Sequence, residues 1–275
     1  MSPEDPGIEP RTGLPSQRRR VDVEAVTVTV LPTIGIVASE LSLYFGSRSG
    51  ALWGHVVTLL FCVIAPLWFS DHTSVLGALA LVSVFRLVNL GMPVFFQLTV
   101  YWLPLIYGPL VPALLLVRRS YPDPEHELDW YWLLALGPLA TALSVLLAEV
   151  EFSIIAPEAL IPTWSPLQLL FLTVIMVGFV GFVEELLFRA ILQPSLQTRV
   201  GRWPGLVLAS AVFGLMHSSY GEPVEILFAG GIGLVFGLLY EQTGSVALVT
   251  VIHGMLNVFL FAVIPMQGSV LDLLA

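Results

Sequence analysis

The stretch Phe171–Leu196, FLTVIMVGFVGFVEELLFRAILQPSL, is an apolar segment that contains two adjacent carboxylates and an arginine. A charge near the centre of a bilayer costs at least about 2.5–3.5 kcal/mol, so these groups predict a function or a specific pairing. Glu185 and Arg189 are four residues apart and share one helix face, where they can form an ion pair. Glu184 is turned by about 100° from Glu185 and can therefore face a cavity. The alternative is a helix end at which the charged side chains reach the headgroups.

The composition of the chain is that of a membrane protein. Of its 275 residues, 56% are hydrophobic and 11% are charged, with a mean hydropathy of +0.88. A soluble domain carries about 25% charged residues, so most of this chain must lie in lipid. The net charge of -9 argues against a nucleic-acid partner. The single cysteine, Cys62, lies in an apolar run and is interpreted as a core residue.

Apolar segments near the ~20 residues needed to cross a bilayer predict an all-α, polytopic transmembrane bundle of eight or nine spanning helices. The segments lie at 26–46, 51–69, 73–92, 96–117, 130–149, 167–190, 203–219, 223–240 and 245–265. Residues 1–24 are polar and proline-containing, and they predict a disordered cytoplasmic tail. The helices within 25–150 have no role assigned from the sequence, and residues 165–265 form the predicted catalytic domain.

The arginines predict the orientation, because cytoplasmic loops carry the excess of basic residues. With the tail in the cytoplasm, Arg118, Arg119, Arg199 and Arg202 also fall on the cytoplasmic side. The loop predicted at 150–166 contains glutamates but no basic residue, which fits the outside. The sequence therefore predicts a multi-pass protein of the cell membrane with a cytoplasmic N-terminus.

Two further ionisable residues lie within the predicted N-terminal helices. Glu40 belongs to the first apolar segment and Arg86 to the third. Counting about 1.5 Å per residue from the cytoplasmic ends places both roughly 20 Å into the membrane. We predict that they form a structural ion pair rather than take part in chemistry.

Three polar residues in the last helices could complete a site around Glu184. His217 follows Phe213 by four residues, and Asn257 follows His253 by four. A lone histidine on an apolar face is more often a hydrogen-bonded core residue than a catalyst. Here, however, Glu184 and His217 lie at similar distances along the sequence from the turn near residues 200–202, so they can meet at one depth.

This set of groups suits hydrolysis. A carboxylate and an imidazole that share a water can deprotonate it, and they can later protonate a leaving amine. His253 and Asn257 can donate hydrogen bonds to the oxyanion that forms. The alternative is a zinc site made of Glu184, His217 and His253, since glutamate and two histidines are a known catalytic ligand set. The soluble metalloprotease motif His-Glu-x-x-His is absent.

At these residues the chain resembles the CAAX protease and bacteriocin-processing (CPBP or Abi) family, which includes the type II CAAX prenyl endopeptidase. The family pattern is Glu-Glu-x-x-x-Arg, then Phe-x-x-x-His, then His-x-x-x-Asn or Asp, and all three parts occur here in order within about residues 165–262. The resemblance implies an intramembrane endopeptidase. It assigns the activation of water to Glu184 and His217, and the ordering of the site to Glu185 and Arg189. His253 and Asn257 would support the oxyanion.

The resemblance and the chemistry together lead us to expect no cofactor, with zinc as the alternative. Unpaired backbone groups in hydrocarbon cost several kcal/mol each, so we expect a membrane-anchored or lipidated substrate, cut near the cytoplasmic side. Two other functions remain as alternatives. A proton-coupled transporter also uses buried Glu and His, but it predicts internal repeats that are not visible here. An inactive family member could serve as a scaffold or immunity protein.

Overall fold

The described part of the chain is helical. The computed structural model describes residues 23–91, 99–121, 124 and 128–269, and within these ranges it contains helices and turns but no strand. The predicted all-α class is therefore confirmed. Residues 1–22 of the predicted tail lie outside the described ranges, and α1 begins at Val23.

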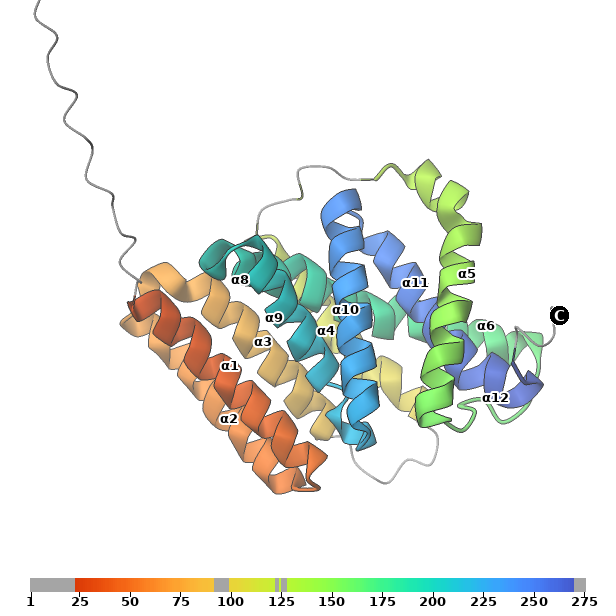
Figure 1. Ribbon diagram of the computed structural model, residues 1–275, viewed down its shortest axis with the longest axis horizontal. Coiled ribbons are helices and arrows are strands. Elements are labelled where there is room, and N and C mark those ends of the chain that lie inside the picture. Colours follow the sequence, from red (N-terminus) through yellow and green to blue (C-terminus); the bar gives the residue numbers. More distant parts are fainter. Residues whose placement is uncertain (1–22, 92–98, 122–123, 125–127, 270–275) are drawn as a thin grey trace, which may run out of the picture.

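The helices pack into one bundle, with the N-terminal helices α1, α2 and α3 on one side and α5 on the other (Figure 1). The long helices are α1 (Val23–Tyr44), α2 (Arg48–Ile64), α3 (Thr73–Leu90), α4 (Thr99–Arg118), α5 (Trp130–Ile155) and α10 (Pro223–Thr243). The shorter helices are α6 (Pro166–Ile175), α7 (Phe182–Leu187), α8 (Gln193–Val200), α9 (Arg202–Leu215), α11 (Val246–Val258) and α12 (Ile264–Gln267). The 3-10 and π segments are η1 (Ala65–Leu67), η2 (Ser70–His72), η3 (Met176–Gly181), η4 (Phe188–Leu192), η5 (Ser218–Tyr220) and η6 (Phe259–Val263).

Eight helical runs in the described ranges are long and apolar enough to cross a membrane, as the prediction of eight or nine requires. The segment predicted at 203–219 is the one that is shorter than expected. It forms α9, which has 14 residues and ends at Leu215. The chain then turns through η5 to Gly221, whose φ of 74° lies in the left-handed region that glycine adopts without strain. His217 consequently lies in a turn and not within a spanning helix.

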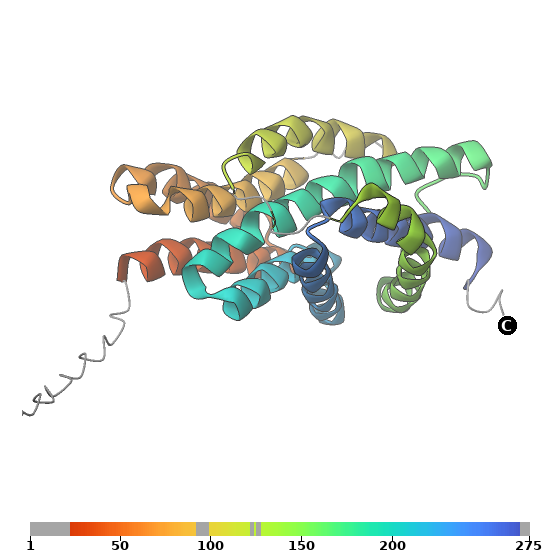
Figure 2. The ribbon, with the colours of Figure 1, turned by 90° about the horizontal axis from the view of Figure 1, so that it is seen from above.

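The longest helical run, from Pro166 to Val200, extends across most of the molecule (Figure 2). It begins at Ser165, whose side chain accepts a hydrogen bond from the backbone of Gln168 as an N-cap. The run consists of α6, η3, α7, η4 and α8, so its α-helical hydrogen bonding is interrupted by two π segments, η3 and η4. The two adjacent glutamates lie in α7, between these segments. Short π segments inside α-helices are frequent at functional sites.

Backbone contact between η3 and α11 brings the two halves of the site together. A Cβ atom added to Gly254 would lie 2.5 Å from the Cα of Val177, and one added to Gly181 would lie 3.0 Å from the carbonyl oxygen of Thr250. Glycine is therefore required at Gly254 for this close approach, and a larger residue at Gly181 would need its neighbours to move by a few tenths of an ångström. It places His253, next to Gly254, against the helix that carries the glutamates.

The two ends of the bundle differ in charge. The arginine end, as we call it, carries Arg118, Arg119, Arg199 and Arg202. Arg199 donates a hydrogen bond to the backbone carbonyl of Asp71, and the amide of Leu128 donates one to Thr243 over 2.9 Å, so the turns on these four segments meet at this end. At the opposite end, α5 finishes at Ile155 and α10 begins at Pro223 (Figure 1).

Candidate active site

Glu185 lies at the centre of a buried charged cluster. Its Oε2 atom is 2.9 Å from Nε of Arg189, one helical turn later, and both side chains are fully buried. Its Oε1 atom is 2.7 Å from Nδ1 of His253 on α11. The predicted pairing of Glu185 with Arg189 is therefore present in the structure. Because a buried charge without a partner is costly, this cluster holds α7 and α11 in a defined register.

Arg189 is enclosed by aromatic rings. Its guanidinium carbon lies 4.7 Å from the ring centroid of Phe213 and 5.9 Å from that of Phe236. The Phe213 ring in turn packs edge-on against His253, with centroids 5.9 Å apart. The phenylalanine four residues before His217 thus has a physical role, since it lies between the arginine and the two histidines and excludes water from the ion pair.

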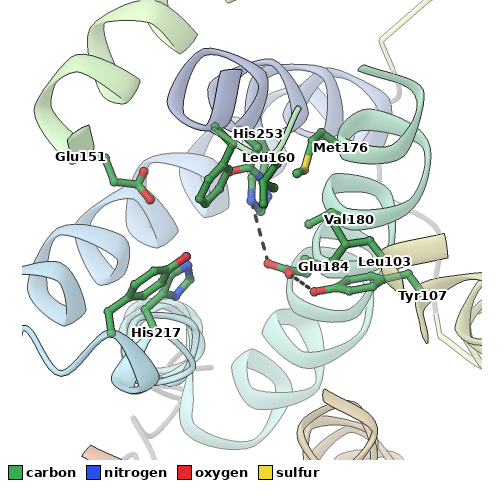
Figure 3. A pocket seen from close by; sticks show the side chains of 12 residues that line it. Leu103, Tyr107, Glu151, Leu160, Met176, Val180, Glu184, His217 and His253 are labelled. Carbon is green, nitrogen blue, oxygen red and sulfur yellow. Dashed lines mark hydrogen bonds and ion pairs between the residues drawn. The ribbon is translucent and has the colours of Figure 1, made fainter. Parts of the chain in front are cut away.

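Glu184 has a different environment from its neighbour. Its Oε1 atom accepts a hydrogen bond from the hydroxyl of Tyr107 on α4 over 2.8 Å. Its Oε2 atom lies 3.9 Å from Nε2 of His253 and faces a cavity of about 230 Å³ (Figure 3). The side chain is 13% exposed, whereas that of Glu185 is fully buried. Glu184 is thus the carboxylate that can contact a bound water or substrate.

His217 faces the same cavity from the turn after α9 (Figure 3). Its Nδ1 atom is 3.1 Å from the carbonyl oxygen of Phe213. A carbonyl only accepts hydrogen bonds, so Nδ1 carries the hydrogen and Nε2 keeps its lone pair when the ring is neutral. Burial lowers the pKa of His217 to about 4, which keeps the ring neutral at neutral pH. His217 therefore presents a basic nitrogen that is not used by this contact.

Asn257 completes the group of predicted residues around the cavity. It lies four residues after His253 on α11, is 8% exposed, and lines the cavity together with Glu184, His217 and His253. The structure thus brings all six predicted site residues together, four of them at the cavity wall and Glu185 and Arg189 behind it.

Comparison with known protein families agrees with this geometry. Residues 166–259 match the family described as type II CAAX prenyl endopeptidase Rce1-like. Over this segment the chain is similar to that family. No curated protein and no solved structure matches the chain. All six predicted residues lie within the matched segment, and similarity to this family points to a protease.

Two of the polar residues that line the cavity come from outside the matched segment. Tyr107 lies in α4 and Glu151 in α5, and neither was singled out from the sequence. The prediction of a loop beginning at residue 150 was wrong, because α5 continues to Ile155 and Glu151 is buried within it. The apolar residues that follow Glu151, in the stretch FSII, were the signal for this continuation. Tyr107 carried no comparable signal, because it lies in an apolar helix with three internal prolines.

The alternative zinc site would consist of Glu184, His217 and His253. Within the described ranges, no group of three or more histidine, cysteine, aspartate or glutamate side chains is arranged to hold a metal ion. Glu184, His217 and His253 share the cavity wall without forming such a group.

Proposed function

We propose that the chain is an intramembrane endopeptidase in which Glu184 and His217 activate a water molecule. The observation that carries this proposal is that two groups able to accept a proton, Oε2 of Glu184 and Nε2 of His217, face one cavity from different elements. A water held between them loses a proton to one of them as its oxygen attacks the peptide carbonyl carbon. The same proton then passes to the leaving amine when the C–N bond breaks.

The oxyanion formed in this step needs hydrogen-bond donors. The side-chain amide of Asn257 is one candidate on the cavity wall. His253 is the other, under one condition. Its Nδ1 must donate to the Glu185 carboxylate, so Nε2 can donate only when the ring carries both protons. In that form the imidazolium has Glu185 and Glu184 as counter-charges, at 2.7 Å and 3.9 Å.

We infer that the substrate carries its own membrane anchor, either an apolar segment or a lipid. The cavity is lined by residues of several candidate spans, including α4, α5, α7 and α11. A water-soluble peptide would lose backbone hydration on entering such a site, at several kcal/mol for each unpaired group. Each buried CH₂ group of a lipid chain contributes about 0.8 kcal/mol and offsets part of that cost.

The test is the hydrolysis of one peptide with and without a C-terminal lipid, by purified protein in bilayers. We expect the lipidated peptide to have a kcat/KM at least about tenfold higher, given the contribution of each buried CH₂. Glu184→Gln protein of normal thermal stability serves as the control for contaminating peptidases. Equal kcat/KM for the two peptides would reject the anchored substrate, and equal cleavage by the Glu184→Gln protein would reject the protease itself.

The orientation adds a proposal about the side of cleavage. The residues lining the cavity lie between the middle of the bundle and the end opposite the arginine end, as Leu160 and Tyr220 illustrate. If the arginine end is cytoplasmic, as the distribution of basic residues indicates, the cavity opens toward the outer face. We therefore propose cleavage near the outer face, in place of the cytoplasmic cleavage expected from the sequence.

Cysteine labelling tests this orientation. Ser120 is exposed at the arginine end and Glu158 is exposed at the opposite end. In a Cys62→Ala background, an impermeant thiol reagent added to intact cells should label Glu158→Cys and leave Ser120→Cys unmodified until the cells are opened. The reverse pattern would place the cavity on the cytoplasmic side.

A further inference from the structure

Glu151 is a second carboxylate in the cavity that the proposed chemistry does not use. It lies near the end of α5, across the cavity from Glu184 (Figure 3). The residue is only 6% exposed, and what remains accessible faces the cavity that it lines. Glu151 also lines a small adjoining pocket with His217, His253 and Asn257, so it stands next to the reacting groups.

Glu151 and Glu225 are buried carboxylates for which no hydrogen bond or ion pair is present in the described ranges, and of the two only Glu151 lines the cavity. By contrast, Glu40 and Glu185 are each paired with an arginine. Burial of an ionised carboxylate without a partner is strongly unfavourable. Such a group is tolerated when it is neutral or when a cation lies beside it, and the cavity that Glu151 lines gives a cation from outside access to it.

The charge around the cavity indicates what that partner is. The residues lining it include two carboxylates, Glu151 and Glu184, but no arginine, and the chain contains no lysine. The buried arginines nearest in the fold, Arg86 and Arg189, are held by Glu40 and Glu185. The cavity is thus acidic on the side of Glu151, because His253 already has Glu185 and Glu184 as counter-charges and His217 is neutral.

We propose that Glu151 binds a cationic group of the substrate and so selects a peptide with a positive charge near the cleaved bond. An ammonium or guanidinium group would form a charge-assisted hydrogen bond with the carboxylate, and the low polarity of the site would strengthen it. The cation is either a basic side chain or the free amino terminus of the peptide. This inference rests on the proposed protease function and adds a substrate class to it.

The experiment compares pairs of lipidated peptides in which one side chain is either charged or neutral. Arginine is placed in turn at each residue around the cleaved bond, and each peptide has a twin with citrulline, which has nearly the same shape without the charge. At one position we expect the wild-type protein to favour arginine by at least about tenfold in kcat/KM, the size of one hydrogen bond to a charged group. In Glu151→Gln protein this ratio should fall to near one.

Glu149 provides the matched control. It lies two residues earlier in α5 and does not line the cavity, so Glu149→Gln protein should keep the wild-type preference for arginine. A twin set of peptides with an acetylated amino terminus separates the two sources of charge. If acetylation lowers kcat/KM in wild-type protein but not in Glu151→Gln protein, the cation is the amino terminus, whereas a preference for arginine over citrulline identifies a side chain.

Binding measurements distinguish failure of this inference from failure of the protease assignment. The affinity of each peptide pair is measured with Glu184→Gln protein, in which no cleavage is expected, and with the Glu151→Gln/Glu184→Gln double variant. Tighter binding of the arginine peptide that is lost in the double variant supports the inference, whatever the wild-type protein cleaves. Equal affinity for arginine and citrulline peptides at every position, together with equal affinity for peptides with a free and an acetylated amino terminus, overturns it. The ratio of kcat/KM for charged and neutral peptides in wild-type protein tests the preference directly. The inference can therefore be contradicted even if the Glu151→Gln variant folds poorly.

Discussion

The molecule contains two buried glutamate–arginine–histidine clusters, and they differ in how completely the carboxylates are bound. In the N-terminal cluster, Glu40 receives hydrogen bonds from Arg86, His55 and Ser218. The Nε of Arg86 and Nε2 of His55 lie 2.7 Å and 3.0 Å from Oε1 of Glu40, and the Ser218 hydroxyl donates to Oε2 over 2.6 Å. Both oxygens are thus bound, and the Glu40 side chain is fully buried.

In the second cluster, the corresponding contacts are distributed over two glutamates. Glu185 takes the arginine and one nitrogen of the histidine, as Glu40 does. Glu184 keeps only the hydroxyl of Tyr107 as a hydrogen-bond donor and turns its other oxygen to the cavity. A fully bound carboxylate has no remaining capacity for a water or substrate, so the first cluster stabilises the fold while the second leaves one group available for chemistry.

The two clusters are linked through Ser218. Its hydroxyl donates to Glu40 and accepts a hydrogen bond from Arg86 over 3.2 Å, and it is the residue directly after His217. The predicted Glu40–Arg86 ion pair is present, and it therefore also fixes the turn that carries His217. This suggests a role for the N-terminal helices, since α1, α2 and α3 hold the proposed base in position.

The largest expected effect on activity comes from substitution of Glu184, which has one oxygen at the cavity, or of His217. Glu184→Gln and His217→Ala should each lower kcat by about 10²–10⁴-fold, the usual contribution of a positioned acid or base. The thermal stability of both proteins should stay near that of the wild type, because neither residue belongs to a buried glutamate–arginine ion pair. Kinetics and thermal unfolding of the purified proteins provide the measurements, and near-normal turnover by either variant would contradict the proposed roles.

Breaking either buried glutamate–arginine ion pair should instead destabilise the folded protein. Arg86→Ala and Arg189→Ala each leave a buried carboxylate without its cation, which costs about 3–5 kcal/mol. We expect a large loss of thermal stability in both variants, and a loss of activity as well in Arg189→Ala. The double variant Glu40→Gln/Arg86→Met removes both charges and should recover part of the stability. A wild-type melting temperature for Arg86→Ala would show that the N-terminal cluster is not structural.

A smaller effect is expected at the link between the clusters. Ser218→Ala removes two hydrogen bonds to charged groups and should cost about 1–3 kcal/mol of stability. If the hydroxyl positions His217, kcat should fall several-fold with little change in KM. Ser219 is exposed and adjacent, so Ser219→Ala is the matched control. Equal kinetics for the two variants would indicate that Ser218 contributes to stability alone.

Removal of metal ions should have the smallest effect. If Glu184 and His217 act directly on water, protein treated with a chelator should keep its activity. Loss of activity that one equivalent of zinc restores would instead favour a zinc site formed by Glu184, His217 and His253. That result would replace the proposed mechanism, although the family assignment would stand.

Much of the site could be predicted because its signals are local in the sequence. Glu185 and Arg189, Phe213 and His217, and His253 and Asn257 are each four residues apart, and this spacing places them on one helix face. Helix ends were less predictable. The apolar pattern continues past Leu215 and does not predict the end of α9 there, and α5 continues six residues beyond the predicted end at residue 149, to Ile155.

The sequence by itself determined the membrane class, the all-α architecture and the six residues of the predicted site. These follow from hydrophobicity and helical spacing, which are properties of short segments. Only the tertiary structure decided which carboxylates are paired with an arginine and which one faces the cavity. It also placed Tyr107 and Glu151 at the cavity and Ser218 between the two clusters. These depend on contacts between helices far apart in the chain, such as the close approach of α11 to η3 at Gly181 and Gly254. No local pattern specifies which faces of such helices meet, because in lipid that choice is made by packing and by pairing of the buried polar groups.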